Sequence, residues 1–245
     1  MEHREYIRRV PGSDTAVLLI HGIVGTPRHF DDLLQQIPAE WSVHNLLLDG
    51  HGGTVEDFAR TSMEKWKAQV ACRLGELLQT HKQVLLIGHS MGTLFAIQNA
   101  VDHPDRVPAL FLLGCPLRVR YPPKTMFQSI RAALGKTDPA AVLLRNDSSV
   151  HLSPKLWKYL MWIPRFWELL RECRRIRKLL PALHTPTVCF QSRKDEMVSM
   201  KSCKALEKNP VIHTEILEES GHFAYSPGDT KRLRQALNRL LQQYF

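Results

Sequence analysis

One pentapeptide, Gly88-His89-Ser90-Met91-Gly92, constrains the fold of this chain more than any other stretch. It follows the apolar run 83–87 and precedes a helix-like stretch over 93–101. A serine held between a buried strand and a helix occupies a tight turn that exposes its hydroxyl. The flanking glycines remove side chains where strand and helix approach each other closely. The pattern predicts Ser90 as a nucleophile; the alternative is a Gly-rich turn with an ordinary helix-capping serine.

Strand-like and helix-like segments alternate on both sides of this motif. The predicted strands are 6–10, 15–20, 43–48, 83–87, 108–113, 186–191 and 212–217, and the predicted helices 29–37, 62–80, 93–101, 200–208 and 229–243, the last capped by Asp229. The continuous apolar runs are typical of strands buried inside a parallel sheet. The alternation predicts an α/β fold with a mostly parallel sheet flanked by helices. Chemistry in such sheets lies at the carboxyl ends of the strands.

The alternation stops between 117 and 185, after the strand that ends near Cys115. We expect a helix over 126–134, a turn at Asp138-Pro139 and an amphipathic helix from Phe166 to Leu180. An insert at the carboxyl end of a strand folds back naturally over the site. The sequence therefore predicts an α/β core formed by 1–116 and 186–245, and a helical cap formed by 117–185.

The net charge of +9 is concentrated in this insert, which holds 14 of the 33 Lys and Arg residues but 4 of the 24 Asp and Glu residues. A basic face is usually only solvated, but it could meet the phosphates of an acyl-CoA or an acidic acyl-carrier protein. It could also touch an anionic membrane surface, weakly. No accompanying motif indicates nucleic-acid binding.

The remaining composition favours a cytoplasmic globular protein, monomeric or dimeric. The chain of 245 residues, 44% hydrophobic, is long enough to bury a sizeable core. It shows neither an apolar leader nor a membrane-length apolar run. Its five cysteines are scattered, as expected for structural thiols. Neither zinc-ligand spacing nor a phosphate-binding loop occurs, so we expect no metal and no cofactor.

A nucleophilic serine needs a base and an acid that orients the base. Asp195 and His222 each follow a predicted strand, in the chain order Ser, Asp, His. Three other carboxylates compete for the acid role: Glu196, Glu218 and Glu219. Asp195 is favoured because it directly ends its strand and precedes Met197-Val198, which can pack back into the protein.

The tetrahedral intermediate of acyl transfer also needs hydrogen-bond donors for its oxyanion. The main-chain N–H groups of Met91, directly after the nucleophile, and of Ile23, in the loop after strand 15–20, are the expected pair. Each such donor typically lowers the barrier by roughly 3 kcal/mol. We interpret His21, His51 and His89 as side chains that brace the main chain rather than as bases.

The motifs around these residues resemble those of the α/β-hydrolases, in particular the small capped bacterial carboxylesterases and monoacylglycerol lipases. The similar motifs are His21-Gly22-Ile23-Val24-Gly25-Thr26-Pro27, Gly50-His51-Gly52, Gly88-His89-Ser90-Met91-Gly92, Gln191-Ser192-Arg193-Lys194-Asp195-Glu196-Met197-Val198 and Glu219-Ser220-Gly221-His222. The resemblance implies an α/β-hydrolase fold and hydrolysis of short- to medium-chain acyl esters or monoacylglycerols through a Ser-His-Asp acyl-enzyme, without a cofactor. The insert matches no signature of that group.

The substrate pocket is the least constrained part of this prediction. Candidate lining residues are Trp157, Trp162 and Trp167 in the insert, together with Cys115, Val198 and Phe223 at strand ends. The tryptophans could equally form the core of the insert itself. Two further functions stay open: a thioesterase or acyltransferase acting on acyl-CoA or acyl-carrier substrates, and a ligand-binding protein that barely turns over.

Overall fold

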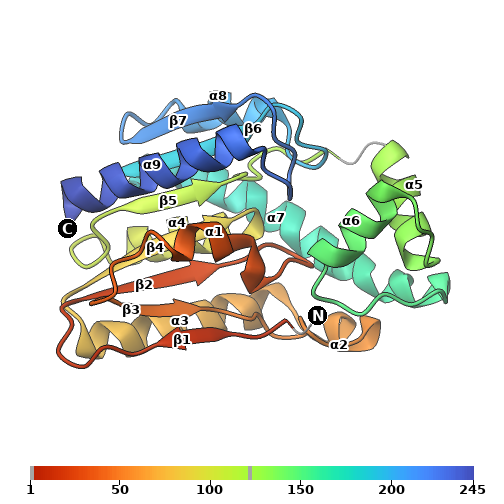
Figure 1. The fold of residues 1–245 in the computed structure, drawn as a ribbon, viewed down its shortest axis with the longest axis horizontal. Coiled ribbons are helices and arrows are strands. Elements are labelled where there is room, and N and C mark those ends of the chain that lie inside the picture. The colour runs from red at the N-terminus through yellow and green to blue at the C-terminus, as the bar shows by residue number, and fades with distance from the viewer. Residues whose placement is uncertain (1–2, 121–122) are drawn as a thin grey trace.

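The computed structural model describes residues 3–120 and 123–245 and places a seven-stranded sheet at the centre of the molecule (Figure 1). The strands are β1 (Tyr6–Arg8), β2 (Thr15–Ile20), β3 (Ser42–Asn45), β4 (Gln83–His89), β5 (Leu110–Leu113), β6 (Thr187–Ser192) and β7 (Ile212–Leu217). Their order across the sheet is β1-β3-β2-β4-β5-β6-β7. Only β1 pairs antiparallel, with β3, while the other pairings are parallel. The predicted mostly parallel α/β sheet is confirmed.

Both faces of this sheet are covered by helices. The helices are α1 (Asp31–Leu34), α2 (Val55–Arg60), α3 (Met63–Thr80), α4 (Met91–Asp102), α5 (Pro123–Ala133), α6 (Pro139–Asp147), α7 (Ile163–Leu179), α8 (Cys203–Leu206) and α9 (Pro227–Tyr244), with short 3-10 helices at Pro27–Phe30, Leu156–Trp162, Leu180–Ala182 and Met200–Ser202. Successive strand residues point to opposite faces, so Leu18 packs on the side of α3 and α4 while Leu19 packs on the side of α1 and α9. All six residues of β2 are buried, as its continuous apolar run requires.

Three local predictions are corrected by the structure. Asp138-Pro139 is not a turn but the start of α6, because the Asp138 carboxylate accepts a hydrogen bond from the Ala141 N–H and proline fits the first helical turn. Ser226, rather than Asp229, caps α9. The helix expected over 200–208 is a 3-10 turn followed by the four residues of α8.

A short helix, α2, was missing from the prediction altogether. Its six residues begin after Thr54, whose hydroxyl accepts from the Asp57 N–H while the Asp57 carboxylate accepts from the Thr54 N–H. This reciprocal capping box stabilises a helix that is too short to show a clear periodicity.

The long helix of the insert, α7, is amphipathic in the predicted sense. Leu169, Cys173 and Ile176 are buried in the same core layer as the strand residues Leu18 and Leu86. The opposite side is basic and exposed. The inner side of α7 thus belongs to the packing of the central sheet, while α5 and α6 lie at one end of the molecule (Figure 1).

Candidate active site

Ser90 lies between the last residue of β4 and the first residue of α4. Its backbone has φ 50° and ψ −122°, a strained conformation for a residue with a side chain. A Cβ added at Gly92 would lie 1.9 Å from the carbonyl oxygen of Ile20, and one added at Gly88 would lie 2.8 Å from the backbone of Thr93. Both glycines are therefore needed for strand and helix to approach each other around Ser90.

The structure brings Asp195 and His222 to this serine. His222 Nε2 lies 3.0 Å from Ser90 Oγ, and His222 Nδ1 lies 2.7 Å from Asp195 Oδ2. All three side chains are buried. With Nδ1–H donating to the carboxylate, the lone pair on Nε2 is free to accept the hydroxyl proton of Ser90.

Asp195 is held in its ionised form by its surroundings. Its Oδ1 accepts the main-chain N–H groups of Met197 at 2.7 Å and Val198 at 2.6 Å. Burial would raise the pKa of this carboxyl, but His222 beside it and the two N–H donors outweigh burial and leave the pKa below its ordinary value. Val198, a predicted pocket residue, thus orients the carboxylate through its main chain.

The three competing carboxylates have other partners. Glu218 binds Arg193 and Glu219 binds Lys194, both at exposed positions. Glu196 Oε2 accepts the main-chain N–H of His222 at 3.0 Å. Glu196 therefore braces the loop that carries the histidine, a role the sequence analysis did not foresee.

The loop after β2 lies directly against Ser90. A Cβ added at Gly22 would lie 2.7 Å from the Cβ of Ser90, so only glycine permits this approach. Ile23 follows Gly22 in the loop. Met91 is the first residue of α4, and its N–H has no carbonyl acceptor within the helix. The two expected oxyanion donors therefore flank the serine on two different segments.

Val24, next to Ile23, is held by hydrogen bonds at both its N–H and its carbonyl. Its φ of 59° is rare for a β-branched residue. Its N–H donates to His51 Nε2 at 3.0 Å, and its carbonyl accepts the N–H of Ser149, from the insert, at 3.1 Å. These two bonds hold the loop in its strained form.

The other histidines near Ser90 brace the main chain, as expected. His21 Nε2 accepts the Leu48 N–H at 3.0 Å, and His89 Nε2 donates to the His222 carbonyl at 3.0 Å. Burial lowers the pKa of His51 to about 4 and, with a smaller effect of neighbouring His222, that of His89 to about 3. Burial also lowers the pKa of His21 well below its ordinary value. These side chains are neutral near pH 7.

The insert is hydrogen-bonded to loops at the carboxyl ends of several strands. Gly52 donates to the Ser149 carbonyl, and His151 donates to the Gly53 carbonyl. Arg120, from the start of the insert, donates through its guanidinium to the Asp195 carbonyl at 2.7 Å. Residues on both sides of the site are therefore tied to the insert.

The predicted pocket residues occupy different environments. The Phe223 ring lies 4.6 Å from that of His222, so this residue borders the site. Cys115 is fully buried in the core. Trp162 is buried with its ring 4.5 Å from Phe58, and its Nε1–H donates to the Val55 carbonyl. Trp157 and Trp167 are 66% and 59% exposed, so they form neither a closed pocket nor a core for the insert.

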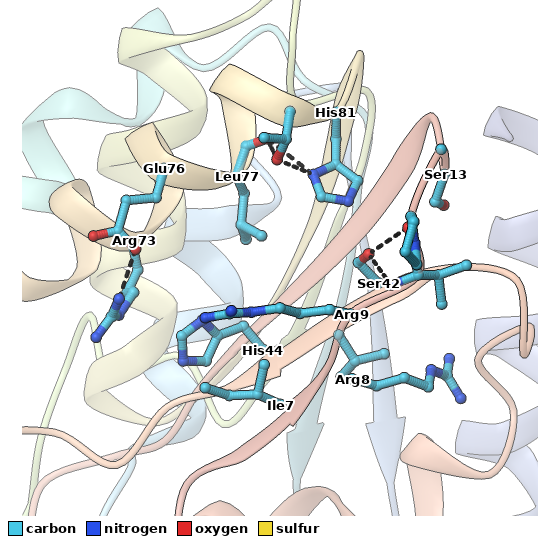
Figure 2. A pocket seen from close by; sticks show the side chains of 15 residues that line it. Ile7, Arg8, Arg9, Ser13, Ser42, His44, Arg73, Glu76, Leu77 and His81 are labelled. Carbon is cyan, nitrogen blue, oxygen red and sulfur yellow. Dashed lines mark hydrogen bonds and ion pairs between the residues drawn. The ribbon is translucent and has the colours of Figure 1, made fainter.

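A separate cavity of about 480 Å³ lies between β1, β3 and the end of α3. Figure 2 shows that its polar side chains pair locally: Arg73 with Glu76, and His81 with the Leu77 carbonyl. Ser42 Oγ bonds to the main chain of Val10. None of these pairs resembles a nucleophile with its base, so this cavity is a weaker candidate than the surroundings of Ser90.

Two other classes of site, a membrane-spanning helix and a metal centre, are absent from residues 3–120 and 123–245. No helix there combines the length and the apolar character needed to cross a bilayer. No group of three or more His, Cys, Asp and Glu side chains there is arranged as metal ligands. All five cysteines are free; Cys72 is exposed and the other four are buried.

Comparison with curated proteins identifies relatives that are esterases and lipases by name. The chain is 37% identical over 90 residues to a thermostable monoacylglycerol lipase from Bacillus sp. (strain H-257), a match that covers 36% of each chain. It is 32% identical over 166 residues to a pimeloyl-[acyl-carrier protein] methyl ester esterase from Neisseria meningitidis, which covers 67% of this chain and 49% of the relative. The matches thus span about a third to a half of these relatives.

Solved structures share the fold along nearly the whole chain. A structure from work on LipS and LipT, two metagenome-derived lipolytic enzymes, has a TM-score of 0.74 at 19% identity and covers 99% of this chain and 98% of its own. A monoacylglycerol lipase from Paleococcus ferrophilus has a TM-score of 0.70 at 19% identity, with both chains covered fully. At this identity the likeness shows the fold alone.

A family profile matches most of the chain. Residues 17–232 match the profile described as "Alpha/beta hydrolase family". This range begins in β2, contains the Ser90 turn and the insert, and ends in α9. The chain belongs to the alpha/beta hydrolase family.

Proposed function

We propose that this chain hydrolyses carboxylic esters through an acyl-enzyme on Ser90, with His222 as the general base and Asp195 as the acid that orients it. The observation that carries the proposal is the continuous hydrogen-bond chain from Asp195 Oδ2 through His222 to Ser90 Oγ. A serine that only caps a helix does not require a buried histidine and a buried carboxylate aligned with its hydroxyl.

The mechanism follows from the geometry of these three side chains. Ser90 Oγ attacks the ester carbonyl carbon while its proton passes to His222 Nε2. The N–H groups of Ile23 and Met91 stabilise the negative charge on the carbonyl oxygen. His222 then gives the proton to the leaving alcohol, and an acyl-enzyme is left. Water loses a proton to His222 and attacks the acyl carbon, which releases the acid and restores the Ser90 hydroxyl.

The preferred substrates in this proposal are short- to medium-chain acyl esters or monoacylglycerols. Support comes from the monoacylglycerol lipase among the relatives and from Phe223, an aromatic side chain beside His222 that can contact an acyl chain. Residues 117–185 serve as the cap, since Ser149 and Arg120 bond to loops on both sides of Ser90.

A second candidate function is cleavage of an acyl group carried by coenzyme A or an acyl-carrier protein. It is favoured by the basic insert and by the relative whose name specifies an acyl-carrier methyl ester. Acyl-CoA and the matching acyl-pantetheine carry the same thioester but differ in phosphates. A preference for acyl-CoA that vanishes in high salt would favour this candidate.

Rapid-mixing kinetics with p-nitrophenyl butyrate tests the leading proposal. Wild-type protein should release a burst of nitrophenol equal to the protein concentration or turn over steadily, and Ser90→Ala should do neither. Equal hydrolysis by both proteins would overturn the assignment of Ser90. Stoichiometric binding of an ester without any turnover would point to the ligand-binding alternative. A series from acetate to laurate then gives the chain-length preference.

A further inference from the structure

The outer face of the insert carries large apolar side chains that are exposed to solvent. Four of them define a row that we call the apolar stripe: Trp157, Leu160, Ile163 and Trp167, with exposed fractions of 66, 65, 49 and 59%. The first three recur every three residues, which is the period of the 3-10 helix over Leu156–Trp162. The fourth follows Ile163 by four residues, one turn along α7. The four side chains therefore share one side of two consecutive helical segments.

The apolar stripe is held in place by packing on the opposite side of the same segments. Tyr159 and Trp162 point inward: their rings are 4.9 Å apart, and the Trp162 ring packs against Phe58 of α2 at 4.5 Å. The carboxylate of Glu168 accepts the N–H of Met63, at the start of α3. The outward direction of the apolar stripe is thus fixed by the fold.

A row of positive charge continues the stripe along α7. Arg171, Arg174 and Lys178 follow Trp167 at spacings of four, three and four residues, and all three are exposed. We call these residues the basic row. The two acidic residues of α7 are engaged elsewhere, Glu168 with Arg165 and Glu172 with Arg175. The outward face of α7 is therefore apolar in its first turns and cationic in the rest.

We propose that the apolar stripe and the basic row form a docking surface for an anionic lipid–water interface. An amphipathic helix that lies in such an interface buries aliphatic and tryptophan side chains at the level of the headgroups, while Lys and Arg pair with lipid phosphates. Basic side chains next to an anionic leaflet add attraction that salt screens.

Other occupants fit this surface less well. An acidic protein would pair with the basic row, but its charged surface would not bury four neighbouring apolar side chains of this size. In a symmetric dimer the same face meets itself, so the apolar stripes could pack but the two basic rows would find no acidic partner. The stripe follows the outer side of a helix and not a groove, so a flat, deformable surface suits it better than a peptide. The proposal does not depend on the reaction at Ser90.

Sedimentation with sucrose-loaded vesicles tests the proposal. The full chain should sediment with vesicles of phosphatidylcholine and phosphatidylglycerol at low salt, and much less with phosphatidylcholine alone or in high salt. The double variant Trp157→Ser/Leu160→Ser and the double variant Arg171→Gln/Arg174→Gln should each weaken binding by roughly tenfold or more. Lys201→Gln/Lys204→Gln removes the same charge from another exposed site and should bind like wild type.

The proposal fails if the wild-type chain stays in solution with anionic vesicles, or if the stripe and basic-row variants bind as well as the control variant. It also fails if the chain binds an acidic acyl-carrier protein or forms a dimer through this face while ignoring vesicles. Circular dichroism checks that each variant is folded. Quenching of wild-type tryptophan fluorescence by brominated anionic lipids gives a second readout without any substitution; its absence would likewise overturn the proposal.

Discussion

Ser90 is 5% exposed and sits in a strained turn between β4 and α4, whereas Trp157 is 66% exposed on the outside of the insert. The partners around Ser90 come from separate segments: Gly22 follows β2, Asp195 follows β6 and His222 follows β7. In the insert, a tryptophan is buried or exposed according to the side of the helix that it occupies. Motif spacing therefore indicates the residues around Ser90, whereas the fold is needed to show which tryptophans of the insert are exposed. The following substitutions test whether catalysis and surface binding divide in this way.

The largest effect is expected from Asp195→Asn. The substitution removes the charge beside His222 and its preference for the correct tautomer, so kcat should fall by roughly 10⁴-fold. Glu196→Gln is the matched control, because Glu196 bonds to the main chain of His222 and Asp195 bonds to its ring. It should change kcat by about tenfold or less. If the two variants lose activity equally in a p-nitrophenyl ester assay, the acid is wrongly assigned.

Two tryptophans of the insert should differ sharply in their contribution to stability. Trp162 is buried against Phe58, so Trp162→Ala should lower the free energy of unfolding by about 3–5 kcal/mol. Trp157→Ala should change it by about 0.5 kcal/mol or less, because the ring is mostly exposed. Urea unfolding of both variants gives the comparison. Similar losses of unfolding free energy in the two variants would contradict the buried position of Trp162 and the exposed position of Trp157.

Acid should destabilise the region around Ser90. Burial lowers the pKa of His51 to about 4, and burial with neighbouring His222 lowers that of His89 to about 3, from an ordinary 6.5. The unfolded chain therefore binds more protons, and stability present above pH 6.5 is lost as the pH falls toward these values. Asp147 acts in the opposite direction, since burial raises its pKa to about 6, but its partial exposure weakens the effect.

The net result should be a loss of about 3 kcal/mol in the free energy of unfolding between pH 7.5 and pH 5, since His51 and His89 each contribute about 2 kcal/mol and Asp147 offsets about 1 kcal/mol. Urea unfolding at both values measures it. His51→Gln should remove about 2 kcal/mol of this dependence and no more, because His89 keeps its contribution. A wild-type stability that does not vary over this range would contradict the buried, neutral state of these histidines.

The smallest effect concerns the loop that holds Ile23. His51→Ala removes the acceptor for the Val24 N–H, so the loop should relax and kcat should fall by roughly ten- to a hundredfold with little change in KM. His51→Gln retains an acceptor and should recover part of kcat. A change confined to KM would show that His51 does not position the oxyanion donors.

Most of the sheet, and the positions of the three candidate residues after strands, could be predicted from the sequence, because apolar runs and Gly-rich turns are local signals. The run 212–217 coincides with β7, and Ser90, Asp195 and His222 each follow a strand. α2 was missed because its six residues show no clear periodicity, although Thr54 and Asp57 carry a capping-box pattern.

The apolar and basic sides of α7 could be predicted from its periodicity, but the direction of the insert's tryptophans could not. Tryptophan is compatible with an acyl pocket, a core or an interface, and the choice depends on which side of the helix meets α2 and α3. Glu196 shows the same limit: its bond to the His222 main chain joins two loops 26 residues apart. Such contacts depend on tertiary packing and leave no local pattern.

The most direct test of the central claim is covalent labelling with a fluorophosphonate, with the labelled residue located by mass spectrometry. A serine activated by His222 should react stoichiometrically, and the label should reside on Ser90 alone. Ser90→Ala should remain unlabelled, and His222→Ala should react more slowly by several orders of magnitude. A label on another residue, or equal labelling of wild type and Ser90→Ala, would contradict the account.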